Sequence, residues 1–147
     1  MKSIILTTEE VRAMDGRKTQ TRRIVKPQPS SGIRNSVFVK SGLEDGHGRE
    51  LKIPFQPGDI LYVRETWQNI CATPLQYAYK ADGEFEPYSP WKPSIHMPKE
   101  AARLFTRVID IKAERWLGKM IKGIKDPWVW VISFERVIDP TAKAGGL

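Results

Sequence analysis

The chain is organised around the stretch DGRKTQTRR, residues 15–23, in which four positive charges accompany one negative charge and two threonines. Gly16 tolerates the left-handed conformation that closes a helix, and the Thr-Gln-Thr run that follows favours an extended chain. On a strand, alternate side chains share a face, so Thr19, Thr21 and Arg23 point the same way. The stretch therefore predicts a short helix that ends at Gly16 and a strand that follows it.

This strand face combines two hydroxyls with a guanidinium, and the ammonium of Lys18 is close to them in the sequence. Such a set suits a phosphate group or the polar edge of a nucleobase. A basic turn on a solvated surface has the same composition, so the stretch leaves both interpretations open.

The composition indicates one folded domain, because a chain of 147 residues with 40% hydrophobic residues can bury a core. The formal net charge of +7 favours a polyanion or an anionic substrate as partner. No apolar run approaches the roughly 18 residues that cross a bilayer, and residues 1–6 are too short an apolar core for a signal peptide. We expect a cytoplasmic monomer with no membrane partner, one domain over residues 1–138 and a flexible tail over residues 139–147.

Motifs of several enzyme classes are absent from the sequence. It has no Gly-rich phosphate loop, dinucleotide fingerprint or Gly-x-Ser-x-Gly elbow. His47 and His96 lack the spacing of metal ligands, and the single Cys71 excludes an internal disulfide. We therefore expect neither a cofactor nor a metal.

The alternation of apolar and polar residues predicts mainly short strands with a few short helices. Strands are predicted at residues 3–6, 19–25, 37–39, 51–53, 60–67, 76–81, 104–113 and 128–137, and helical segments at residues 7–16, 99–103 and 116–124. This order indicates the α+β class, and the antiparallel-style turns favour a small β-barrel with short helices at its ends.

Within the strand predicted at residues 60–67, Glu65 falls on the same face as Leu61 and Val63, which is the expected core face. A carboxylate there must be paired, or must lie where the core opens into a pocket. One interpretation is a functional pocket. The other is an ion pair with Arg23 or another base that only positions the strand.

Two further segments contain most of the tryptophans. Residues 91–98, WKPSIHMP, are irregular and proline-rich, as segments that line binding sites often are; the alternative is a loop pinned into the core by Trp91. In residues 128–137 the alternation places Trp128, Trp130, Ile132 and Phe134 on one face, which predicts a core strand.

Four segments in order resemble the ASCH domain of the PUA-like superfamily, in the branch found in bacteriophages and prophages. They are GRKTQTRR at residues 16–23, PGDILYVRETW at residues 57–67, WKPSIHMP at residues 91–98 and PWVWV at residues 127–131. The resemblance implies a PUA-like β-barrel with a cleft beside the Gly-Arg-Lys-Thr turn, and a role in RNA binding.

Some ASCH proteins are amidohydrolases that remove the acetyl group from acetylated cytidine with a Lys, a Thr and a Glu. The motif match places the Lys on Lys18 and the Thr on Thr21. The family's Glu belongs to a later helical segment that is short here, so the match does not place it. Glu65, at a different position, is the carboxylate considered in its stead.

Two hypotheses follow. The preferred one is a module that binds RNA, another single strand or a modified nucleoside. Its candidate binding residues are Arg17, Lys18, Thr19, Arg22, Arg23, Arg64, Trp67, Trp91, Lys92, Ser94, His96 and Arg103. The alternative is the amidohydrolase, in which Lys18 acts as base or orients water, Thr21 is nucleophile or proton relay, and Glu65 sets their protonation. Both place Lys18, Thr21 and Glu65 in one concave site.

Overall fold

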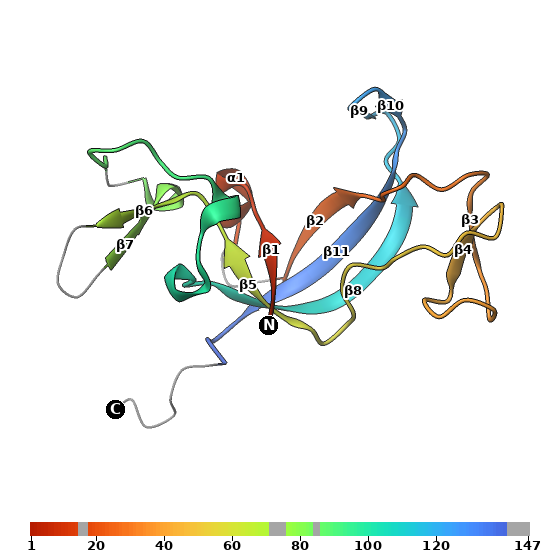
Figure 1. The fold of residues 1–147 in the computed structure, drawn as a ribbon, viewed down its shortest axis with the longest axis horizontal. Helices are drawn as coiled ribbons and strands as arrows, with labels where there is room; N and C mark the ends of the chain where they lie inside the picture. Colours follow the sequence, from red (N-terminus) through yellow and green to blue (C-terminus); the bar gives the residue numbers. More distant parts are fainter. Residues whose placement is uncertain (15–17, 71–75, 84–85, 141–147) are drawn as a thin grey trace. The chain divides into compact units, whose positions relative to one another are not determined.

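The computed structural model describes residues 1–14, 18–70, 76–83 and 86–140, with Lys18 described by its backbone alone (Figure 1). The described chain is mostly β-strand with little helix, which agrees with a small, β-rich α+β fold. In chain order the elements are β1 Lys2–Ile5, α1 Thr8–Arg12, β2 Lys18–Ile24, β3 Ile33–Asn35, β4 Leu43–Asp45, β5 Ile60–Arg64, β6 Trp67–Ile70, β7 Gln76–Tyr79, the 3₁₀ turns η1 Lys80–Asp82, η2 Ser94–His96 and η3 Lys99–Ala101, β8 Phe105–Arg115, β9 Met120–Ile121, β10 Ile124–Lys125 and β11 Trp128–Val137.

Five strands form one sheet in the order β1-β5-β8-β11-β2. β1 runs parallel to β5, and β5 runs antiparallel to β8. Three small antiparallel pairs accompany the sheet: β3 with β4, β6 with β7, and β9 with β10. β1 and β2 are the outer strands of this order, and the described strands do not form a closed barrel.

The chain divides into two compact units, which interleave along the sequence. The first unit contains residues 1–19, 59–107 and 134–147, and the second contains residues 20–58 and 108–133. The tail predicted at residues 139–147 falls outside the described residues from residue 141 onward.

In the first unit the helix begins as its sequence predicts. The backbone N–H of Glu10 donates to the Thr7 hydroxyl at 3.1 Å, and the backbone N–H of Thr7 donates to the Glu10 carboxylate at 3.0 Å. This capping box satisfies two N–H groups that a helix start leaves open. Val11 in α1 and Met14, two residues beyond the helix end at Arg12, are both buried, and the helix ends earlier than its sequence predicts.

The stripe predicted on β11 is a core stripe. Trp130, Ile132 and Phe134 are buried, and Trp128 is half-buried. Val129 and Val131, which point to the opposite face, are buried as well. Both faces of this strand are therefore covered along its first half.

The prediction of a helix at residues 116–124 is wrong. This segment holds β9 and β10, which pair through Ile121 opposite Ile124. Lys122 and Gly123 connect them with positive φ angles of 50° and 80°, the backbone of a tight two-residue hairpin turn. The apolar residues recur at helical spacing, but the Lys-Gly pair makes a turn where the helix would have to continue.

Other details of the strand prediction are also corrected. Residues 37–39 and 51–53 are not strands, and the short pair in that region is β3 with β4. The alternation of residues 104–113 places Phe105, Ile109, Ile111 and Ala113 on one face, but only Phe105 of these is buried, and Ile109 is 36% exposed. Thr106 and Val108 of the other face are buried, so neither face of β8 is buried along its whole length.

Candidate functional site

Glu65 lies in the first unit between β5 and β6, and its side chain is 1% exposed. Arg103 donates to both carboxylate oxygens, from Nε to Oε2 at 3.2 Å and from Nη2 to Oε1 at 2.9 Å. Its remaining amino group, Nη1, donates to Asp82 Oδ1 at 2.7 Å. The core-facing position predicted for Glu65 is confirmed, and of its two interpretations the ion pair is the one observed, with Arg103 as the base.

Tyr79 covers this ion pair. The Arg103 Cζ atom lies 4.1 Å from the centre of the Tyr79 ring, and the phenol donates to the Ala101 carbonyl. Burial raises the pKa of Tyr79 to about 12, although the positive charge of Arg103 acts in the opposite direction. Burial by itself lowers the pKa of Arg103, but the hydrogen bonds to Glu65 and Asp82 outweigh it and raise that pKa above its ordinary value.

The irregular segment 91–98 is fixed to Trp67, the first residue of β6. Trp67 and Lys92 exchange backbone hydrogen bonds at 3.3 and 2.8 Å, and the Trp67 indole N–H donates to the Pro93 carbonyl at 3.1 Å. Arg64 Nη1 reaches the Ile95 carbonyl at 3.4 Å, and Met97 is buried beside Trp67. The segment is thus held at several points on β5 and β6.

Trp91 and Trp67 are candidate residues for stacking a base, but Trp67 does not offer its ring at the surface. The residue is 5% exposed and belongs to a core cluster with Met97 and Ala101. The Lys92 ammonium lies 4.9 Å from its ring centre. Trp91, the other tryptophan considered for stacking, is half-buried, and the residues that anchor the segment are Trp67 and Met97.

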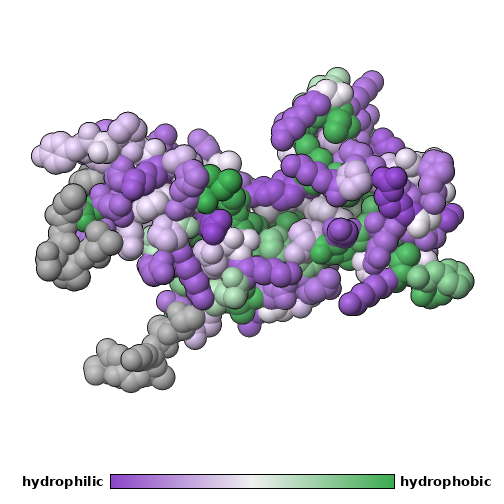
Figure 2. All heavy atoms as spheres, viewed as in Figure 1, coloured by the Kyte–Doolittle hydropathy of each residue, from purple (hydrophilic) through white to green (hydrophobic). Residues whose placement is uncertain are grey.

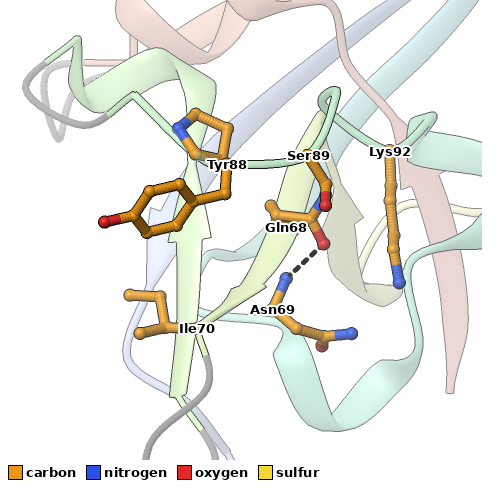
Figure 3. A pocket seen from close by; sticks show the side chains of 7 residues that line it. Gln68, Asn69, Ile70, Tyr88, Ser89 and Lys92 are labelled. Carbon is orange, nitrogen blue, oxygen red and sulfur yellow. Dashed lines mark hydrogen bonds between the residues drawn. The ribbon is translucent and has the colours of Figure 1, made fainter.

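One hollow, of about 440 Å³, lies where β6 meets the segment that precedes Trp91 (Figure 3). It is lined by Gln68, Asn69, Ile70, Pro87, Tyr88, Ser89 and Lys92. Figure 3 shows Tyr88 and Ile70 on one side of the hollow and Lys92 on the other. Gln68 donates to the Pro90 carbonyl at 2.7 Å and accepts from the Asn69 backbone N–H at 2.8 Å, so this side chain braces the wall. We call this hollow the Tyr88 pocket.

A second hollow of the same unit, of about 390 Å³, is lined by Ile5, Leu6, Thr7, Thr8, Glu9, Arg12, Thr66, Lys80 and Ser94. The Arg12 guanidinium hydrogen-bonds the main chain there: its Nε donates to the Ala81 carbonyl at 3.1 Å and its Nη2 donates to the Lys80 carbonyl at 3.2 Å. Segment 91–98 thus contributes Lys92 to one hollow and Ser94 to the other, and His96 is exposed.

The basic strand β2 has the alternation that its sequence predicts. Arg23 Nη1 donates to the Thr21 hydroxyl, and it also donates to the Arg22 carbonyl at 3.0 Å. Thr21 is buried and Thr19 half-buried. Arg22 points elsewhere, with its Cζ atom 5.4 Å from the ring centre of Trp116.

The predicted shared site of Lys18, Thr21 and Glu65 stays a prediction. Arg17 and the side chain of Lys18 lie outside the described residues. Thr21 belongs to the second unit and Glu65 to the first. In the first unit, the described part of the chain brings Lys92 against the Trp67 ring, Arg64 against the Ile95 carbonyl, and Arg103 against Glu65.

Sequence reasoning did not identify Tyr79, Asp82 or Tyr88 as parts of these sites. Asp82 belongs to an Asp-Gly pair that signals only a turn, and its contact with Arg103 spans 21 positions. Tyr88 follows a proline in a segment without periodicity, and no local signal marks it.

Within the described ranges, no group of three or more His, Cys, Asp or Glu residues is placed to hold a metal ion. No helix in this part of the chain is both long and apolar enough to span a membrane. No protein-family model, curated protein or solved structure matches the chain.

Proposed function

We propose that this chain is a nucleic-acid-binding protein of the ASCH and PUA-like kind, which takes single-stranded RNA or a modified nucleoside through the Tyr88 pocket and segment 91–98. The observation that carries the proposal is the lining of that pocket. An exposed aromatic ring, a primary amide, a hydroxyl and an ammonium surround one hollow of nucleoside size, from Tyr88, Asn69, Ser89 and Lys92.

Each of these groups has a part to play with a nucleotide. An exposed aromatic ring can stack on any of the nucleobases. The amide of Asn69 can both donate and accept, as the edge of a base requires. The ammonium of Lys92 provides a positive charge for a phosphate, and the hydroxyl of Ser89 can hydrogen-bond either the phosphate or the base edge.

The anchoring of the segment supports this use. Lys92 is held at its backbone by Trp67 and at its ammonium by the Trp67 ring. A side chain fixed in this way loses less conformational freedom when a ligand binds. The exposed His96 and the half-buried Ser94 continue the polar edge of the same segment.

The amidohydrolase alternative is the weaker proposal because of the state of Glu65. Both oxygens of this carboxylate accept hydrogen bonds from Arg103, and the side chain is closed off from solvent. A general base must be within reach of the proton that it takes. An engaged and buried carboxylate fits a structural role better.

Fluorescence anisotropy with a labelled single-stranded RNA tests the proposal. Tyr88 is fully exposed, so Tyr88→Ala leaves folding intact, and we expect it to weaken binding by about 1–3 kcal/mol, as for loss of one stacked base. Lys92→Ala should weaken binding in the same assay. Lys40→Ala removes an exposed lysine from a turn of the second unit and is the matched control.

Binding should also fall steeply with salt. For about four phosphate contacts on a single strand, the log–log slope should be near −3. A flat salt dependence, or equal losses in Lys92→Ala and Lys40→Ala, would rule out this pocket as the binding site.

A further inference from the structure

The second unit contains an arm that the proposed function does not use. We define the hairpin arm as residues 115–128, which link the end of β8 to the start of β11 through β9 and β10 (Figure 1). Backbone bonds join its two sides from base to tip. The Trp116 N–H donates to the Pro127 carbonyl at 2.9 Å and the Asp126 N–H to the Lys119 carbonyl at 2.8 Å, so the arm is a two-stranded ribbon.

A bulge re-aims one side of the arm. Leu117 and Gly118 are extra residues on the strand that runs outward, and the Asp126 carboxylate accepts from the Gly118 N–H at 2.7 Å. Bulges of this kind turn a neighbouring side chain toward a new direction. Leu117 is 75% exposed here, and Met120 is 64% exposed, so the arm presents apolar groups near its tip (Figure 2).

The arm is strongly basic, and two of its charges, together with Arg22 of β2, lie beside aromatic rings. Arg22 Cζ and Lys119 Nζ lie 5.4 and 5.0 Å from the centre of the same Trp116 ring, and Arg115 Cζ lies 5.2 Å from that of Trp128. Like charges gathered on one element repel each other, and a polyanion bound to them offsets that repulsion.

The backbone conformation of Lys122, at the tip of the arm, is a second and independent observation in favour of a functional role. Its φ of 50° is in the left-handed region, which the hairpin turn requires and which Asn or Gly adopts far more readily than Lys. Strain of this kind persists at sites of function more often than elsewhere. The outermost point of the arm thus carries a lysine, which suits the turn less well than Asn or Gly but adds a positive charge there.

We infer that the hairpin arm is a binding element for double-stranded DNA, inserted into the major groove with its lysines against the phosphates. This surface is separate from the Tyr88 pocket, and the inference does not depend on the proposed function. The major groove of B-DNA, about 12 Å wide, admits a two-stranded β-ribbon. The major groove of an RNA duplex is deep and narrow and does not.

The lysines of the arm are placed for that geometry. Lys125 pairs across the ribbon with the exposed Met120, and Lys119, Lys122 and Lys125 are all exposed. A ribbon in a groove has phosphates on both sides, so lysines along the ribbon can contact the phosphates of both DNA strands. Leu117 and Met120 would meet base edges, where thymine methyl groups offer apolar contact.

The experiment compares Lys122→Gly with the intact chain on a short mixed-sequence DNA duplex. Glycine relieves the positive φ, so the melting temperature should stay equal or rise, while duplex affinity falls. We expect the log–log salt slope to become shallower by about 0.9, the share of one phosphate contact. This combination separates the proposal from a structural role, which would move stability and binding in the same direction.

Lys40→Ala, which removes one exposed charge elsewhere in the second unit, should keep the duplex affinity and slope of the intact chain. Unchanged duplex binding in Lys122→Gly would overturn the inference, as would equal losses in both variants. Stronger binding to the corresponding single strand, or binding to phosphatidylserine vesicles without binding to the duplex, would overturn it as well. Loss of RNA binding in Tyr88→Ala, with duplex binding retained, would show that RNA and duplex DNA bind through different residues.

Discussion

At the scale of single residues, the chemistry of the first unit centres on the buried carboxylate of Glu65. A charge removed from water is stable only when it is paired and its hydrogen-bonding capacity is satisfied. Arg103 does this with a two-point contact, and Asp82 takes the third arm of the same guanidinium. The three side chains come from separate segments, so they join those segments into one packed group.

Arg103→Ala should lower the free energy of unfolding by about 3–5 kcal/mol, because it leaves Glu65 buried without a partner. Urea denaturation measures the change. Arg107 pairs with Glu135 at the surface, and Arg107→Ala is the control, with an expected loss of at most about 1 kcal/mol. A loss in Arg103→Ala as small as that of the control would show that Glu65 reaches water or another base.

Tyr79 provides a pH-dependent prediction at the same scale. Its pKa is about 12 in the fold and about 10 in an unfolded chain. Between these values the unfolded chain has released the proton and the folded chain keeps it. The stabilising contribution is therefore complete below about pH 10 and is lost as the pH rises through the folded value.

An ultraviolet titration of tyrosinate should show one tyrosine that ionises near pH 12. Tyr79→Phe should abolish that phase. A late phase that survives in Tyr79→Phe would assign the buried phenol to another residue.

At the scale of elements, β11 shows how a strand with two covered faces is built. Trp130 and Ile132 fill one side and Val129 and Val131 the other. A strand of this kind reads as a nearly continuous apolar run, which is the pattern of its sequence. The hairpin arm is a second example. The positive φ angles of Lys122 and Gly123 form a turn there, so the segment is a ribbon and not a helix.

Trp130→Ala should lower the free energy of unfolding by about 3–5 kcal/mol, as for other large deletions in a core. Chemical denaturation provides the measurement. Phe38 is 93% exposed, so Phe38→Ala is a matched aromatic control with an expected change within about 0.5 kcal/mol. A difference below about 1 kcal/mol for Trp130→Ala would reject its place in the core.

At the scale of the whole molecule, the net charge of +7 is uneven, because the residues of the second unit carry +6 and those of the first carry +1. Lys92 and Arg103 belong to the first unit, and Lys119 and Lys122 belong to the second. A polyanion is therefore attracted mainly by the second unit, and variants chosen in pairs separate its contribution from that of the first.

Lys18→Ala tests the shared site implied by the resemblance to the ASCH domain. We expect this variant to impair nucleoside binding more than it lowers the melting temperature, because the role predicted for Lys18 is to contact ligand. Incubation with acetylated cytidine separates the two hypotheses: release of cytidine that is lost in Lys18→Ala supports the amidohydrolase, and binding without turnover supports the module. Unchanged binding in Lys18→Ala would remove Lys18 from the site.

Features that depend on residues close together in the chain can be predicted from the sequence. The capping box at Thr7, the buried stripe on β11 and the inward direction of Glu65 all follow from spacings of two to four positions. Such spacings fix which side chains share a face, because the periods of helix and strand are set by backbone geometry. The β-rich α+β class follows from the same local patterns.

The tertiary structure alone decided which distant groups meet. Arg103 is 38 positions from Glu65, Pro93 is 26 positions from Trp67, and both contacts depend on how separate segments pack. Packing also gave Trp67 its partners Met97 and Ala101, which are about 30 positions away in the chain. The hairpin arm was missed for a related reason: its apolar spacing fits a helix, and only the pairing of Ile121 with Ile124 across a turn makes it a ribbon. Contacts between distant segments are chosen by the burial and hydrogen bonding of the whole fold, and local sequence does not contain that choice.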